Sequence, residues 1–117
     1  MKTLCAIRDL CRSISEFETD FLTKHSLCLN EGMVICSLKD GRLSSGEIAS
    51  QLHLSCSNTS KLLRSVEEKG LIERDMGEKD KRQMYFTLSK EGKRTLKVIE
   101  TESVELPESL SNIIKNI

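Results

Sequence analysis

The spacing of apolar residues changes at Gly70, and this change limits the fold more than any other feature. Before Gly70 the apolar residues recur every three or four positions, which is the period of amphipathic helices. After it, the short segments 71–74 and 83–88 have the composition of strands and flank a charged stretch, as in a β-hairpin. Helices are expected again at 90–102 and from Pro107. We therefore predict a mainly α fold with a small β-hairpin, in the order of a winged helix-turn-helix domain.

Four helices are expected before Gly70. The first covers 3–21, and the others include 33–38, 46–52 and 56–69. Short polar side chains are the expected N-caps of the later helices: Asn30, then Ser44 or Ser45, then Ser55, and Ser89 for the helix after the hairpin. The first helix is long for so small a domain, so it packs either on its own core or on another subunit.

Size and composition restrict the classes of protein that fit. The 117 residues are enough for a single domain, 1–117. No apolar run is long enough to cross a bilayer, and the N-terminus is too charged for a secretory signal, so we expect a cytoplasmic protein without a membrane partner. The five cysteines include no CxxC or CxxH pair, which argues against a disulfide scaffold and a zinc site. We expect no metal and no cofactor.

The charge is zero in total but uneven along the chain. A neutral chain does not bind nucleic acid through bulk charge. However, the segment 55–94 has three more basic than acidic residues, and the remainder has three more acidic than basic residues. Such a chain can present a positive face to a partner. Motifs of catalysis such as GxSxG and HExxH are missing from the sequence, so an enzyme is not expected.

The helix expected at 56–69 has two chemically different faces. Leu62, Leu63 and Val66 form the apolar face. The other face is short and polar near its start and basic further on, with Ser57, Asn58, Ser60, Lys61, Arg64 and Ser65. Short side chains let a helix approach base edges, Asn can pair with adenine, and Lys and Arg can reach phosphates or guanine. The face fits a helix that enters the major groove of DNA, and it also fits an ordinary solvated helix.

The loop of the expected hairpin, 76–82, is the second candidate DNA contact. Its basic residues are Lys79, Lys81 and Arg82. A positive hairpin tip can lie along the DNA backbone or enter the minor groove. Glu78 and Asp80 are also present, so a mixed-charge turn in solvent is the alternative.

The motifs from the second half of the chain resemble those of the MarR family of bacterial transcription regulators. They are S-C-S-N-T-S-K-L-L-R-S-V-E-E-K-G-L-I-E-R (55–74), D-K-R (80–82) and T-L-S-K-E-G (87–92). In that family a recognition helix ends in a Leu-Glu-x-Lys-Gly-Leu type of turn. A wing with Asp-x-Arg and a Leu-Thr-x-x-Gly motif follow it. The resemblance covers about residues 30–95.

The resemblance implies a function and a set of contacts. Ser57, Asn58, Ser60, Lys61 and Arg64 match DNA-facing positions of the recognition helix. In the wing, Asp80 would orient the loop and Arg82 would meet DNA. The family binds pseudo-palindromic double-stranded DNA as homodimers built from N- and C-terminal helices. This implies dimerisation helices at 1–28 and 93–117 around a DNA-binding region at 29–92. It also implies release of DNA by a small-molecule effector or by cysteine oxidation.

Two further hypotheses remain open. Cys56, at the start of the expected recognition helix, is the candidate redox residue, because a helix N-terminus can lower the pKa of a thiol. The alternative reading of Cys56 is simply a small residue at this position. We expect Cys11 and Cys36, which lie in apolar patterns, to be core residues. The alternative function is a winged helix that binds proteins and not DNA, which the neutral charge favours.

Overall fold

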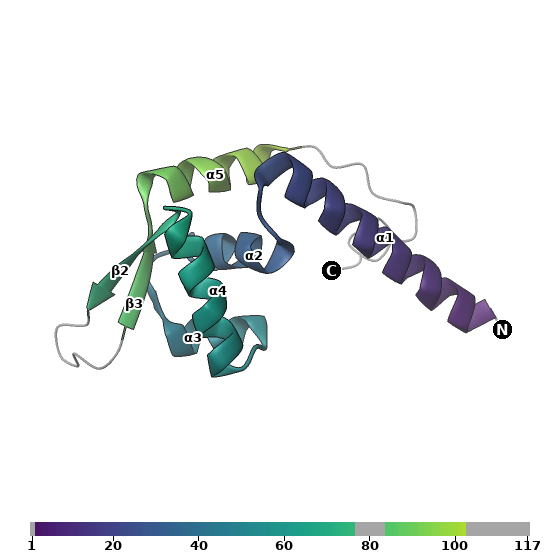
Figure 1. Ribbon diagram of the computed structural model, residues 1–117, viewed down its shortest axis with the longest axis horizontal. Coiled ribbons are helices and arrows are strands. Elements are labelled where there is room, and N and C mark those ends of the chain that lie inside the picture. Colours follow the sequence, from purple (N-terminus) through teal and green to yellow (C-terminus); the bar gives the residue numbers. More distant parts are fainter. Residues whose placement is uncertain (1, 77–83, 103–117) are drawn as a thin grey trace.

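The computed structural model describes residues 2–76 and 84–102. In chain order the elements are α1 (Lys2–His25), α2 (Leu29–Ser37), β1 (Leu43–Ser44), α3 (Ser45–Leu52), α4 (Cys56–Glu68), β2 (Ile72–Met76), β3 (Met84–Leu88) and α5 (Lys90–Thr101). This order confirms the mainly α fold with a small hairpin (Figure 1). The helix expected from Pro107 lies outside the described residues.

The three strands form one antiparallel sheet in the order β1-β3-β2. Ile72 pairs with Leu88 and Met76 with Met84, which confirms the predicted hairpin. Strand β1, in which Leu43 pairs with Phe86, was not expected from the sequence. A strand of two residues is too short to show alternation, and only its position against β3 makes it a strand.

The helix starts follow the expected serines with one exception. The side chains of Ser44, Ser55 and Ser89 accept hydrogen bonds from backbone N–H groups of the first turns of α3, α4 and α5. The prediction for Asn30 is wrong, because α2 begins at Leu29 and its N-cap is Cys28. The carboxylate of Glu31 accepts from the Cys28 N–H at 2.9 Å.

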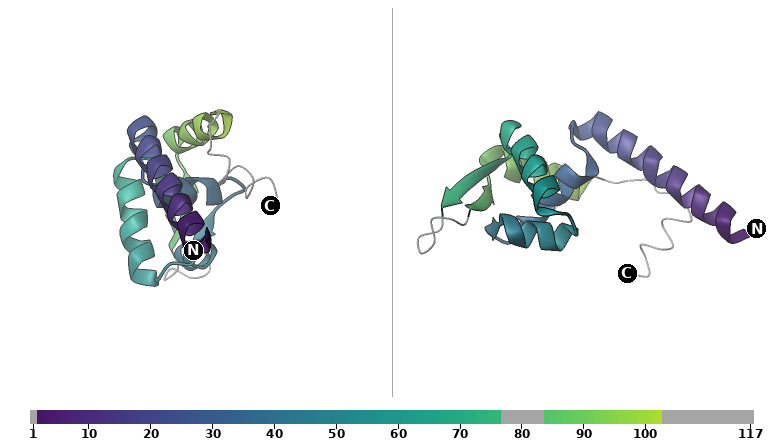
Figure 2. Two further views of the ribbon diagram at one scale, coloured as in Figure 1. Left: turned by 90° about the vertical axis from the view of Figure 1, so that its right-hand side faces the viewer. Right: turned by 60° about the horizontal axis from the view of Figure 1, so that its bottom comes forward.

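The hydrophobic core belongs to the part of the chain after α1. It is made of buried aliphatic residues and one phenylalanine: Leu27, Val34, Ile35, Leu38, Ile48, Leu63, Val66, Ile72, Phe86 and Leu96. Helix α1 contributes no buried residue. It projects from the rest of the molecule, as Figure 1 and the right-hand view of Figure 2 show. The radius of gyration is 16.3 Å, whereas a compact chain of this length has a radius of about 13 Å.

Helix α1 touches the body of the molecule near its C-terminal end. The ring of Phe21 covers Gly32 of α2, where an added Cβ would lie 2.8 Å from the ring. His25 Nε2 lies 2.5 Å from a carboxylate oxygen of Glu102, and Lys24 Nζ lies 3.1 Å from the other. These contacts join the end of α1 to α2 and to the end of α5.

The start of α5 is held against the turn that follows α4. Ser89 donates from its hydroxyl to the Gly70 carbonyl at 2.6 Å and from its N–H to the Leu71 carbonyl at 3.1 Å. A Cβ on Gly92 would lie 1.9 Å from the Leu71 carbonyl oxygen. The last residue of the T-L-S-K-E-G motif therefore has to be glycine for this close approach.

Among the residues that the structure describes, no helix is long and apolar enough to span a bilayer. Nor do the described parts of the chain gather three side chains of His, Cys, Asp or Glu that could hold a metal ion.

Candidate nucleic-acid interface

Helices α3 and α4 form a helix-turn-helix unit. His53 ends α3 in the left-handed conformation, with φ of 55°. The N–H of Leu54 then donates to the Ala49 carbonyl at 3.0 Å, and Ser55 caps α4. On its inner face α4 buries Thr59, Leu63 and Val66. Burial of this face leaves the opposite side of α4 at the molecular surface (Figure 1).

The structure places all five α4 residues of the predicted DNA contact in exposed positions: Ser57, Asn58, Ser60, Lys61 and Arg64. The Ser55 hydroxyl accepts from the backbone N–H of Asn58, at 3.2 Å. Within the described residues no hydrogen bond occupies the Asn58 side-chain amide. The sequence of α4 contains no carboxylate before Glu67. The exposed side of the helix therefore offers hydrogen-bonding and basic groups together.

Ser65 differs from the expectation, because it faces the protein and not the solvent. Its hydroxyl donates to Glu31 at 2.8 Å. Lys69 Nζ lies 2.8 Å from the same carboxylate, which is almost fully buried, and also donates to the Ser26 carbonyl at 3.0 Å. Ser65 lies toward the flank of α4 that meets α2, which places it beside Glu31 and explains the error.

The ionisation of Glu31 follows from these contacts. Burial by itself raises the pKa of Glu31, because it removes water from the charged form. Hydrogen bonds from Lys69, the Cys28 backbone and Ser65 outweigh that effect, so the pKa lies below its ordinary value. Glu31 is therefore a buried carboxylate that stays charged at neutral pH and anchors the C-terminal part of α4.

Two arginines that the sequence analysis did not select hold the hairpin in place. Arg74 Nε lies 2.7 Å from a carboxylate oxygen of Glu67, which links β2 to α4. The guanidinium of Arg42 lies 4.4 Å from the centre of the Tyr85 ring, and its Nη1 lies 3.0 Å from an Asp75 oxygen. Arg42 thus crosses β3 to reach β2. Pairs this far apart in sequence leave no periodic signal.

The predicted wing contacts Lys79, Asp80, Lys81 and Arg82 lie outside the described residues. The structure places the ends of their hairpin, Met76 and Met84, opposite each other. The hairpin extends beside α4 at the same end of the molecule, away from α1 (Figure 1).

All five cysteines are free and exposed, including Cys56 at the first position of α4. The expectation that Cys11 and Cys36 belong to the core is therefore wrong. Cys11 lies on α1, which buries no residue. On α2, the inward positions are taken by Val34 and Ile35, so the thiol-bearing residue next to them faces outward.

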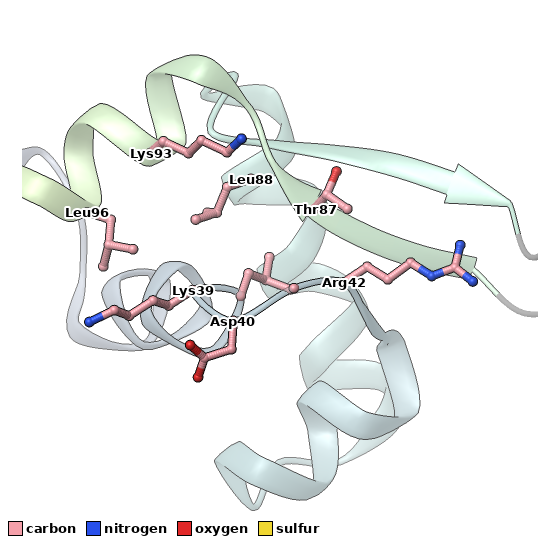
Figure 3. Close-up of a pocket in the computed structure, with 9 residues that line it drawn as sticks. Lys39, Asp40, Arg42, Thr87, Leu88, Lys93 and Leu96 are labelled. Carbon is pink, nitrogen blue, oxygen red and sulfur yellow. The ribbon is translucent and has the colours of Figure 1, made fainter.

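A pocket of about 500 Å³ lies between the end of α2, the segment that leads into β1, β3 and α5. Leu38, Leu88 and Leu96 give it apolar walls, and Thr87 adds a hydroxyl. Figure 3 shows the charged side chains of Lys39, Asp40, Arg42 and Lys93 around it. Lys39 is paired with Glu100 at 2.7 Å and Arg42 with Asp75. The pocket is thus amphipathic, with cationic side chains and the Asp40 carboxylate around an apolar wall.

Known proteins share this architecture. A structure of overoxidized AbfR bound to DNA matches with a TM-score of 0.76 and 23% identity, over 98% of this chain and 87% of that one. The S. aureus MepR–DNA complex matches with a TM-score of 0.67 and 18% identity, over 94% and 86%. YusO from Bacillus subtilis matches with a TM-score of 0.70 and 22% identity, over 98% and 77%. No curated protein matches the sequence.

The sequence itself matches a family model. The model is described as the MarR family, and it covers residues 30–84, from the first turn of α2 to the first residue of β3. This range contains α3, α4 and β2, whereas the T-L-S-K-E-G motif at 87–92 lies beyond it. Residues 30–84 of this chain therefore match the MarR family, as the motifs of the sequence indicated.

Proposed function

We propose that this chain regulates transcription by binding pseudo-palindromic double-stranded DNA as a homodimer, with α4 in the major groove. The observation that carries the proposal is the exposed face of α4, where serines, Asn58, Lys61 and Arg64 lie together without a carboxylate. Such a face can donate and accept hydrogen bonds at base edges and can neutralise phosphates. The neighbours AbfR and MepR, which are described as DNA complexes, support the proposal.

The wing completes the proposed DNA contact. Lys79, Lys81 and Arg82 would lie on the backbone or in the minor groove, with Asp80 orienting the loop. The placement of the hairpin beside α4 supports this, because a loop at its tip can reach the DNA that flanks the groove holding α4. Cys56 stays a candidate redox residue, since oxidation of an exposed thiol at this end of α4 would obstruct contact with DNA.

Helix α1 supports the homodimer. Leu4, Ile7, Ile14 and Leu22 repeat at helical spacing, and 43–55% of each is exposed. A second copy of the chain buries such a stripe with the same stripe of its own, as a two-fold interface requires. The proposed division has dimerisation segments at 1–28 and 93–117 and a DNA-binding region at 29–92. Helix α5 (Lys90–Thr101) crosses the second boundary, and within its later part Leu96 belongs to the core whereas Val98 is exposed.

The amphipathic pocket supports a small-molecule effector. Its walls come from β3 and α5, so a molecule bound there would contact both the wing sheet and the proposed C-terminal dimerisation segment. A neighbour described as a MepR-like protein complexed with pseudoligands is consistent with an effector. The proposed role involves no catalysis and no cofactor, and it places the protein in the cytoplasm with its DNA.

A gel-shift series with random-sequence duplex at rising salt tests DNA binding. We expect binding that weakens steeply with salt. The Lys61→Ala variant should lower affinity for every sequence and reduce the salt slope by about one unit. The Asn58→Ala variant should instead relax preference at one base position, at a cost of about 1–3 kcal/mol on the preferred site. Lys97→Ala, an exposed lysine of α5, is the control.

Failure of all duplexes to shift at low salt would contradict the proposal. It would favour the alternative, a winged helix that binds proteins. If the Asn58→Ala variant keeps the base preference of the wild-type protein, Asn58 does not contact a base. That result alone would not contradict DNA binding.

A further inference from the structure

The joint between α1 and α2 is hydrogen-bonded to the end of α4. Ser26, in this joint, has the left-handed backbone conformation with φ of 56°, and Leu27 beside it is buried in the core. Lys69, the C-cap of α4, donates to the Ser26 carbonyl at 3.0 Å. The helix proposed to read DNA therefore ends on the residue at which the proposed dimerisation helix leaves the body.

Glu31 holds α2, α4 and this joint together through hydrogen bonds. Its carboxylate accepts from the Cys28 N–H, the Ser65 hydroxyl and the Lys69 ammonium at 2.8–2.9 Å, so α2, α4 and the joint share one charged group. Glu31 is only 4% exposed. Removal of one partner from a buried charge is strongly destabilising, so each of the three contacts helps to hold Glu31 and the joint in place.

The length of α1 turns a small movement at this joint into a large one. With 24 residues, α1 is about 36 Å long at about 1.5 Å per residue. A rotation of about 5° at the joint would move the far end by about 3 Å, close to the rise of one base pair of DNA, about 3.4 Å. In a dimer joined through α1, that movement changes the separation of the two α4 helices, which must match successive major grooves about 34 Å apart.

We propose that Glu31 and Lys69 are positioning residues, which fix the angle between α1 and α4 and so select the spacing between the two half-sites of the operator. This inference rests on the proposed function, since it needs a dimer on DNA. Neither residue has to touch a base for it.

The experiment measures spacing preference. Wild-type protein first selects a duplex from a random pool. Binding is then compared on that duplex and on versions with one base pair added to or removed from the centre. We expect Glu31→Gln and Lys69→Met each to reduce the preference for the selected spacing by about threefold or more, and the double variant to add little, because contacting residues are coupled. Lys69→Arg should retain the preference, and Lys97→Met is the matched control.

The outcomes separate this inference from the proposed function. If wild-type protein selects no duplex, the proposed function fails. Loss of folded protein changes the active fraction but leaves the ratio between spacings unchanged, and the active fraction is measured by titration at high DNA concentration. If wild-type protein binds and both variants keep its spacing ratio, the inference is wrong. If Lys69→Met weakens all spacings equally with a lower salt slope, Lys69 is a phosphate contact and the inference is also wrong.

Discussion

Helix α1 and the body that follows it carry the same kind of apolar pattern and bury it to opposite extents. The body places Val34, Ile35, Ile48 and Val66 at 0% exposure. In α1, residues with the same helical spacing leave about half of their surface in solvent. Helical periodicity predicts an apolar face, but it does not say which surface covers that face. The body thus buries its apolar residues within one chain, whereas the apolar face of α1 is the surface on which we propose that a second chain packs.

The largest expected effect comes from truncation in the body. Ile35→Ala should lower the free energy of unfolding by about 2–5 kcal/mol, because it leaves a cavity in the core. Ile14→Ala, the matched change in α1, should alter it by less than about 0.5 kcal/mol at a dilution where dimers dissociate. Chemical denaturation measures both. If both variants lost the same free energy of unfolding at that dilution, α1 would pack on the body of its own chain. That result would contradict the difference between α1 and the body.

A substitution at Gly92 tests the close packing of α5 against the backbone at Leu71. An alanine there would place its Cβ 1.9 Å from the Leu71 carbonyl oxygen, so the start of α5 has to move. We expect a loss of about 1–3 kcal/mol in the free energy of unfolding, as for other overpacked sites. The control is Gly46→Ala in α3, where the new methyl group meets no atom closer than 3.9 Å. Similar stability of the two variants would contradict the close packing of α5.

A charged substitution on the exposed apolar face of α1 tests whether this face is the dimer interface. Ile14→Glu should weaken self-association at least about tenfold, which corresponds to about 1.4 kcal/mol, because a carboxylate would be buried at the interface. Sedimentation equilibrium measures this. Glu16→Gln, on the polar side of α1, should leave association unchanged. A dimer of unchanged strength in Ile14→Glu would place the interface elsewhere.

The smallest expected effect depends on pH. Because the folded state lowers the pKa of Glu31, the charged carboxylate stabilises the protein above its ordinary pKa of 4.5. That stabilisation is lost as pH falls below 4.5 and through the lowered pKa, where the folded state finally binds the proton. Wild-type protein should therefore lose stability faster in acid than Glu31→Gln, whose other carboxylates are the same. Parallel curves from urea titrations at each pH would show that Glu31 contributes nothing.

Local signals in the sequence were sufficient for most of the elements. Ser44, Ser55 and Ser89 cap helices because a capping residue acts on the next three positions, which the sequence displays directly. The exposed face of α4 followed from the positions of Leu63 and Val66 in the same way. Asn30 misled the prediction, since a favourable capping residue can also stand in the first turn when Glu31 bonds the backbone before it.

Contacts between distant segments could not be predicted in this way. Glu31 and Lys69 are 38 positions apart, and Arg42 and Asp75 are 33 apart. Each pair forms only because whole elements pack against each other. The sequence next to either residue therefore contains no pattern that predicts its partner. β1 is a strand only because β3 lies beside it, and Ser65 faces inward only because α2 brings Glu31 to it. Among these contacts, those of Glu31 with Ser65 and Lys69 join α4 to α2.

The most direct test of the account is a methylation-interference footprint on the duplex selected by wild-type protein, with the protein-to-DNA stoichiometry measured on the same complex. Methylation of guanine N7 reports contacts in the major groove. We predict two symmetric sets of interfering guanines centred about 10 base pairs apart, with two chains per duplex. A single set of contacts, or one chain per duplex, would contradict a DNA-binding dimer that uses α4 of each subunit.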